Sequence, residues 1–173
     1  MRVCVFREFP YLYDGNTAYE QTYLRTYAQA PGAAVVVAWD GEHVAGASTC
    51  LPLAAETPNV QKPFLDAGVD ISKVFYFGES VLERAYRGQG IGVKFFDARE
   101  AQARATGHAI TTFCAVQRPA DHPLRPAGYV PLDEFWHHRG YTKRPDLTCV
   151  MSWRDVGAAV ESEKTMTFWT KTL

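Results

Sequence analysis

A glycine-rich turn between an apolar strand and a helix constrains this chain more than any other feature. Residues 74–82 are apolar and rich in β-formers, which predicts a strand. The turn 87–92 reads RGQGIG, and the run of helix formers after it ends at Gly107, which suits a helix C-cap. Glycines let the backbone approach a ligand closely, and the first N–H groups of a helix have no internal partner. We therefore predict that residues 87–92 bind a pyrophosphate, with Arg87 and Lys94 adding positive charge.

The spacing of the glycines indicates which class of phosphate-containing ligand the turn would bind. It does not fit GxGxxG, because the third glycine comes one residue early, and GxxxxGK[ST] is absent. The turn reads Arg87-x-x-Gly90-x-Gly92 instead. This resembles the acetyl-CoA signature, Arg/Gln-x-x-Gly-x-Gly/Ala, of the GCN5-related N-acetyltransferase (GNAT) superfamily. The alternative is a glycine-rich connection that binds no ligand.

The resemblance implies one GNAT domain over residues 1–173, recognisable from about 34 to 153. Its fold class is α/β, in the mixed α+β sense. The expected architecture is a central, mostly antiparallel, twisted sheet of about six or seven strands with one parallel, splayed pair, flanked by about four helices. A length of 173 residues suits one domain with a full core, and 47% hydrophobic with 21% charged residues is typical of a soluble globular protein.

The net charge and the cysteine content limit which partners and which cellular compartment we expect. The net charge of −1 gives no bulk field that would attract nucleic acid or an anionic membrane. The N-terminus has neither the apolar region nor the cleavage site of a signal peptide, and the apolar run 33–39 is far shorter than the roughly 20 residues of a membrane helix. The cysteines are widely spaced without CxxC, which favours reduced thiols over a zinc site or disulfides: Cys4, Cys50, Cys114 and Cys149. We expect a cytoplasmic protein with no metal, no nucleic-acid partner and no membrane partner, and a homodimer as a possible assembly.

Apolar patterns predict the other elements before the glycine turn. Within the helix expected over 14–28, the tyrosines at 19, 23 and 27 fall on one face. We favour packing of this face on the sheet over a role in lining a substrate pocket. The dipeptide Asp40-Gly41 predicts a hairpin between two strands. The expected elements are a strand over 2–7, a helix over 14–28, strands over 34–39 and 43–51, and a short helix over 60–67.

Apolar patterns also predict the elements after the turn. The strand over 108–116 should pair in parallel with 74–82, because a helix connects them. A short helix is expected over 133–139, with Asp133 as its cap. Two further strands are expected over 147–153 and 166–169, separated by a polar link over 154–164.

Two segments near the C-terminal side bear on the site. Residues 117–132 contain four prolines and exceed the usual connection length, which predicts a binding loop or lid; a passive excursion fits equally well. Residues 135–141 read FWHHRGY and resemble the family's closing motif, Phe/Leu-Tyr-x-x-x-Gly-Phe. Trp136 stands where that motif has a tyrosine.

The resemblance implies how coenzyme A would be held. Backbone groups of Val81, Leu82 and Glu83 would bind the pantetheine arm, and the Leu82 N–H would polarise the thioester carbonyl. The pyrophosphate would be held mostly through N–H groups of the turn, by Arg87, Gly88, Gln89, Gly90, Ile91 and Gly92. The resemblance also implies direct attack by the amine in a ternary complex, without an acyl-enzyme.

Two residues are the candidates for acid–base chemistry. Glu79 is a carboxylate in an otherwise apolar strand, so we predict that it is the general base; orienting the substrate amine, or facing solvent, is the alternative. Trp136 has no useful proton to give to the leaving thiolate. We therefore predict Tyr129 as the acid, ahead of His137 and His138, whereas Tyr141 is more typical of a packing residue. Water is a further alternative for this role.

The predicted function is N-acetyl transfer from acetyl-CoA to a primary amine, either of a small molecule or of a peptide. A non-catalytic acetyl-CoA sensor of the same fold is the main alternative, because the tyrosine of the closing motif is missing. A regulator that binds another nucleotide is a third hypothesis, and the glycine spacing argues against it.

Overall fold

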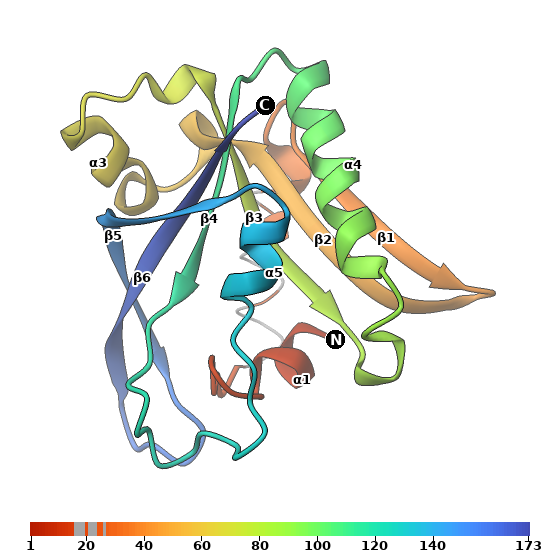
Figure 1. The fold of residues 1–173 in the computed structure, drawn as a ribbon, viewed down its shortest axis with the longest axis vertical. Helices are drawn as coiled ribbons and strands as arrows, with labels where there is room; N and C mark the ends of the chain where they lie inside the picture. The colour runs from red at the N-terminus through yellow and green to blue at the C-terminus, as the bar shows by residue number, and fades with distance from the viewer. Residues whose placement is uncertain (16–19, 21–23, 26) are drawn as a thin grey trace.

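The computed structural model describes residues 1–15, 20, 24–25 and 27–173 (Figure 1). Residues 24–25 and 27–29 are helical. The other helices and strands are α1 (Arg2–Phe6), β1 (Ala34–Asp40), β2 (His43–Pro52), α3 (Pro58–Asp66), β3 (Val74–Leu82), α4 (Ile91–Ala105), β4 (Ile110–Val116), α5 (Asp133–His138), β5 (Thr142–Arg154) and β6 (Glu161–Thr172). No helix in these described ranges is long and apolar enough to span a membrane.

The strands form one six-stranded sheet in the order β1-β2-β3-β4-β6-β5. Every neighbouring pair is antiparallel except β3 and β4, which are parallel and are connected through α4 (Figure 1). The predicted mostly antiparallel sheet with one parallel pair is therefore confirmed. The pairing follows from the chain itself, because short turns join antiparallel neighbours and a helix is needed to return the chain for a parallel one.

Alternating side chains divide the core between the two faces of the sheet. On β3, Phe75 and Phe77 contact one cluster, which includes Phe96 of α4. Val74 and Tyr76 point to the opposite face, where they pack in a second cluster with Phe64 of α3. Helices therefore cover both faces of the sheet, with α4 and α5 on one side and α3 on the other.

Strands β3 and β4 stay together for only three residues. Val74–Tyr76 pair with Ile110–Thr112, and the strands then diverge toward the bottom of Figure 1. A bulge at 78–79 of β3 faces Thr49, because the pairing shifts between Ser48 and Cys50 of β2. Gly78 is required in this bulge, since a Cβ there would collide with the Tyr27 hydroxyl. The divergence and the bulge together shape the opening in which the site lies.

Most predicted elements are confirmed with small changes of boundary. The hairpin turn is Gly41-Glu42 and not Asp40-Gly41, because Asp40 still pairs with His43. Gly107 has the positive φ of 79° expected after a helix, and the His108 N–H donates to the Ala103 carbonyl 2.9 Å away. Tyr27 is 3% exposed, as packing requires, whereas Tyr19 and Tyr23 lie outside the described residues.

Three sequence predictions were wrong in detail. Residues 2–7 do not form a strand; α1 takes their place, and its ends lie against the opening between β3 and β4 and not along a sheet edge. Asp133 is not the cap of α5, because Leu132 holds that position and the Asp133 carboxylate instead accepts from Lys143 at 3.0 Å. The polar link covers only 155–160, since β5 and β6 pair as far as Arg154 and Glu161.

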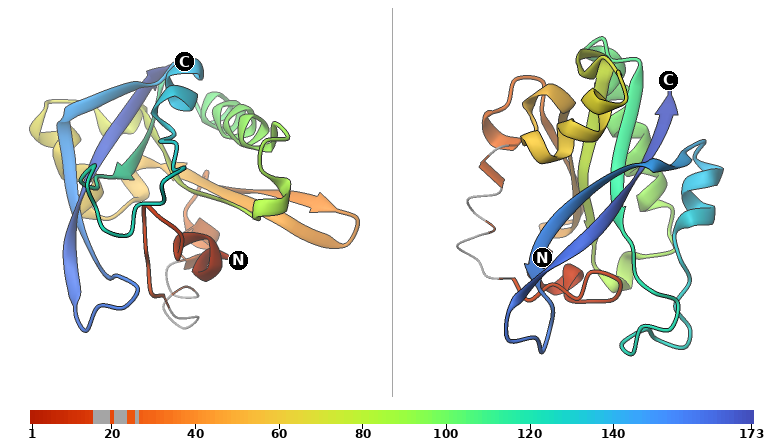
Figure 2. Two further views of the ribbon diagram at one scale, coloured as in Figure 1. Left: turned by 60° about the horizontal axis from the view of Figure 1, so that its bottom comes forward. Right: turned by 90° about the vertical axis from the view of Figure 1, so that its left-hand side faces the viewer.

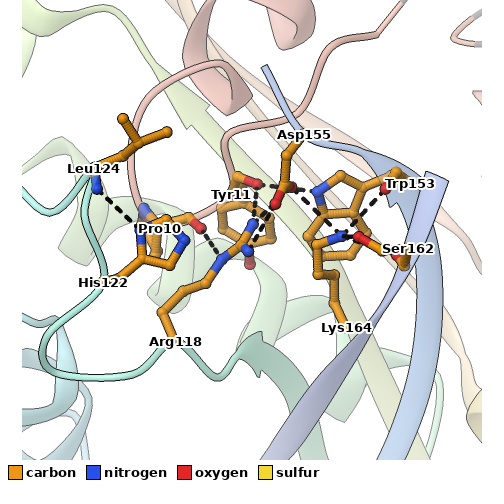
Figure 3. Close-up of polar contacts among 9 residues, drawn as sticks. All are labelled: Pro10, Tyr11, Arg118, His122, Leu124, Trp153, Asp155, Ser162 and Lys164. Atoms are coloured by element: carbon orange, nitrogen blue, oxygen red, sulfur yellow. Dashed lines mark hydrogen bonds and ion pairs between the residues drawn. The ribbon is translucent and has the colours of Figure 1, made fainter. Parts of the chain in front are cut away.

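A buried arginine fixes the N-terminal segment to the sheet (Figure 3). Arg118, at the start of the proline-rich loop, donates to both carboxylate oxygens of Asp155 at 2.8 and 2.9 Å. The same guanidinium donates to the carbonyls of Pro10 at 2.8 Å and Tyr11 at 2.7 Å. Burial raises the pKa of Asp155, but Arg118 and the nearby Lys164 outweigh burial and hold this pKa below its ordinary value.

Replacing Arg118 with alanine is expected to cost about 3 kcal/mol of stability at pH 7, because it leaves Asp155 without its main partner. A carboxyl whose folded pKa is lowered stabilises the fold above its ordinary pKa of about 3.9 and loses that contribution as pH falls through the folded value. Urea unfolding between pH 7 and pH 3 should therefore show a shallower acid loss in the variant. Arg144→Ala is the matched control, because Arg144 pairs with Asp146 at the surface. Equal losses in the two variants would contradict the assignment.

Candidate active site

A large cleft opens where β3 and β4 separate. Its walls are the bulge and end of β3, the turn before α4, the end of β4 and strands β5 and β6. The proline-rich loop 117–132 and the N-terminal segment 2–14 close it on the outer side. Three residues of α1, Arg2, Val5 and Phe6, line the cleft, and Figure 2, left, shows α1 between the loop and β1–β2. The cleft therefore brings the predicted turn, Glu79 and Tyr129 to one place.

The glycine turn presents bare backbone N–H groups. Gly88 and Gly90 have φ values of 75° and 80°, and Gly90 is the N-cap of α4. Within the described part of the chain, no backbone or side-chain oxygen accepts from the N–H groups of residues 88–93. Gly88, Gly90 and Gly92 line the cleft, and a Cβ at Gly88 or Gly90 would meet nothing within 4 Å. This arrangement suits an anion, because the helix dipole adds partial positive charge there.

The end of β3 offers a second set of backbone groups. The Glu83 N–H donates to the Ala45 carbonyl at 3.0 Å, and antiparallel pairing alternates along a strand. The Leu82 N–H and carbonyl therefore point away from β2, and the carbonyl accepts from Arg87 Nε. The backbone groups of Val81 and Glu83 are already used, since Val81 pairs with Ala47 and the Glu83 carbonyl accepts from Tyr86 at 3.0 Å. Binding of the pantetheine arm by this end of β3 stays a prediction, and the Leu82 N–H is the group that β2 leaves unpaired in this register.

The Arg87 side chain has partners of its own. Its guanidinium donates to both Glu8 oxygens, at 2.8 and 3.2 Å, and its Nε donates to the Leu82 carbonyl at 3.1 Å. The side chain of Gln89 likewise folds back onto the Ala85 carbonyl at 2.9 Å. The N–H groups of the turn, and not these two side chains, therefore face the open space.

Glu79 lies in the bulge of β3 with its side chain 6% exposed. Its carboxylate forms an ion pair with Arg2 of α1. Its N–H donates to Thr49 Oγ1 at 3.2 Å, and its carbonyl accepts from Arg99 at 3.5 Å. The carboxylate is therefore held in the wall of the cleft, beside the point where the strands diverge, and its role as general base stays a prediction.

Arg99 is a residue that the sequence did not single out. It is 2% exposed, and its guanidinium lies 4.3 Å from the ring centre of Phe77 and 4.8 Å from that of Phe96. Burial lowers its pKa to about 10, so it remains charged at neutral pH. Arg99 fixes the bulge from the α4 side. The only signal in the sequence was its position on the apolar face of the helix.

The candidates for the acid separate clearly. Tyr129 is half-buried at the cleft, with its ring 4.7 Å from that of Phe9, and burial raises its pKa. Tyr141 is 1% exposed, and its hydroxyl donates to Glu100 at 3.3 Å, so it is a packing residue as interpreted. Trp136 and His137 both pack on Trp169 with ring centres 5.0 Å apart. His137 and His138 are exposed on α5, and the assignment of the acid to Tyr129 stays a prediction.

Cys114 does not have the properties of a nucleophile. It is 9% exposed, and its Sγ lies 3.2 Å from the Tyr76 hydroxyl. The neighbouring Cys149 and burial both raise the pKa of Cys114 well above its ordinary value. A thiol in this state stays protonated, and the thiolate is the reactive form.

The fold matches solved structures of acetyltransferases, although no protein-family model and no curated sequence matches the chain. A ribosomal-protein-alanine N-acetyltransferase from Brucella melitensis gives a TM-score of 0.59 at 16% identity, over 92% of this chain and 80% of its own. An aminoglycoside 6'-N-acetyltransferase complexed with coenzyme A gives 0.57 at 14% identity, over 91% and 81%. A GCN5-related N-acetyltransferase from Kribbella flavida gives 0.56 at 14% identity, over 92% and 79%. The chain has the GNAT fold.

Proposed function

We propose that this chain is an acetyl-CoA-dependent N-acetyltransferase that acts on a primary amine by direct attack in a ternary complex. The observation that carries the proposal is the row of N–H groups at 88–93, which faces open space at the head of the cleft that also contains Glu79. Acetyl-CoA would supply an activated acetyl thioester there. The structural neighbour complexed with coenzyme A supports the choice of ligand.

The residues of the cleft suit the steps of this transfer. The N–H groups of the turn would hold the diphosphate, and the Leu82 N–H would donate to the thioester carbonyl oxygen as negative charge develops on it. Glu79 would take the proton of the attacking amine, directly or through a water molecule. The new N–C bond replaces the C–S bond, and the departing sulfur gains a proton for which Tyr129 is the candidate donor.

The proposal is tested by measuring thiol release with acetyl-CoA across a panel of amines, in parallel with direct binding of CoA. Turnover on at least one amine is expected. A second candidate, a non-catalytic acetyl-CoA sensor, is favoured by one observation: Trp136 is packed against Phe113 and Trp169, and it supplies no hydroxyl. CoA binding without turnover on any amine would support the sensor. Absence of CoA binding would contradict both candidates.

Replacing Tyr129 with phenylalanine should lower kcat by roughly tenfold, because the thiolate would then take its proton from water. The packing of the ring on Phe9 is kept in this variant, so the KM for acetyl-CoA should not change. Steady-state kinetics from pH 6 to pH 9 measure both quantities. An unchanged kcat over this range would assign the acid to another group or to solvent.

A further inference from the structure

Arg2 lines the cleft together with Glu79, and its guanidinium lies between two carboxylates. It forms ion pairs with Glu79 from the bulge of β3 and with Glu20 from the segment before β1. The two carboxylate side chains are only 6% and 8% exposed. Two buried carboxylates that approach one another need a cation between them, because each ionised group is costly to bury alone. Arg2 therefore occupies a cation subsite between Glu20 and Glu79, at the part of the cleft wall that Glu79 forms.

Arg2 does not use the full capacity of this subsite. Glu20 Oε1 is buried, and among the residues that the structure describes it has no hydrogen-bond partner. An ionised carboxylate has several acceptor positions, and buried ones are normally satisfied. The unsatisfied oxygen indicates that a cation with other donors would fit the two carboxylates better than Arg2 does.

The helix that carries Arg2 is short. α1 has five residues, no side-chain cap and no buried residue, and a helix this short is not stable by itself. The contacts of residues 1–9 with site residues include the Arg2 ion pairs and the pair between Glu8 and Arg87. Residues 10–14, by contrast, are fixed by Arg118 and by the Asp14 N–H, which donates to the Arg154 carbonyl at 2.9 Å. Displacement of residues 1–9 breaks the hydrogen bonds from the Leu12 N–H to the Glu8 carbonyl and from the Tyr13 N–H to the Phe6 carbonyl, but it leaves the contacts of residues 10–14 with Arg118 and Arg154 in place.

We propose that Arg2 takes the place of the acceptor, and that the acceptor is a small amine with a second cationic group, an ammonium or a guanidinium. The reacting amine faces Glu79, and the second cation binds Glu20 after α1 has moved away. This inference rests on the proposed function, whose amine site it specifies.

The test is calorimetric titration of the full-length chain, saturated with CoA so that no transfer occurs. The probes are 1,4-diaminobutane and 4-aminobutylguanidine, with 1-aminobutane as the matched monocation. We expect the two dications to bind at least about tenfold more tightly than 1-aminobutane, because a second charge-assisted pair forms. Equal affinities would overturn the proposal. This comparison uses the unchanged chain, so it does not depend on the folding of any variant.

Two variants test the assignment of the subsite. Arg2→Ala should strengthen dication binding by about threefold or more, since the competing guanidinium is removed. Arg7→Ala is the matched control from the same segment, because Arg7 pairs with Asp14 and not with the carboxylate pair. Glu20→Gln should remove the preference for dications. Dication affinity that is the same in Arg2→Ala and in the unchanged chain would overturn the proposed displacement.

A separate CoA titration distinguishes the two hypotheses. If CoA binds and the three amines bind equally, the cation subsite is wrong and the proposed function stands. If the dications are preferred without CoA, but CoA does not bind, the subsite is supported and the acetyltransferase proposal fails.

Discussion

Replacing Gly90 with glutamate should abolish binding of CoA while the fold survives. The new side chain enters the open space in front of the bare N–H groups, where it places a carboxylate beside the diphosphate. Repulsion between two charges about 4 Å apart near a protein surface is worth about 4 kcal/mol, or roughly a thousandfold in affinity. The positive φ of Gly90 adds a strain of about 1–2 kcal/mol, which lowers stability without unfolding the domain. Calorimetry with CoA and thermal unfolding measure the two effects.

The matched control lies at the other end of the same helix. Gly107 has a φ of 79°, and a Cβ there also meets nothing within 4 Å, so Gly107→Glu imposes a similar strain and charge change. It should lower the melting temperature by a similar amount and leave the affinity for CoA unchanged. If both variants bind CoA equally well, the turn does not bind the diphosphate.

Replacing Glu79 with glutamine should lower kcat by about a hundredfold or more, because the amide keeps the shape of the side chain but cannot accept the amine proton. The deficit should shrink as pH rises, since a larger fraction of the free amine is then already neutral. The affinity for CoA should be unaffected. Steady-state kinetics from pH 6 to pH 10 with one amine acceptor measure the effect.

Glu42→Gln provides the control for this variant, because Glu42 is exposed in the turn between β1 and β2, and the chemical change is the same. A structural role for Glu79 would give a deficit that does not depend on pH. An unchanged kcat in Glu79→Gln would remove Glu79 from the mechanism and leave the amine to lose its proton to solvent.

Local patterns in the sequence were sufficient to predict the elements on either side of the glycine turn. β3 is bounded at 74–82 as predicted, and Gly90 and Gly107 have the positive φ values that their positions at the ends of α4 suggested. Glycine spacing and apolar alternation are short-range signals, so they predict these elements without information about residues that are distant in the sequence.

Long-range contacts explain what the sequence did not predict. The alternation of Val3 and Val5 fits a strand, yet Arg2 is held by Glu79, more than seventy positions away, and the segment forms α1 in the cleft. The cluster of Arg118, Pro10, Tyr11 and Asp155 joins three distant segments and could not be read from spacing. Local propensity gives way to such contacts when a segment packs against a site.

The most direct measurement of the central claim is a crystal structure of the full chain grown with coenzyme A. We expect the diphosphate oxygens to lie within hydrogen-bond distance of the N–H groups of residues 88–93, with the sulfur end between β3 and β4 near Leu82 and Glu79. Coenzyme A bound elsewhere, with no anion at the turn, would contradict the assignment of the site and the function proposed from it.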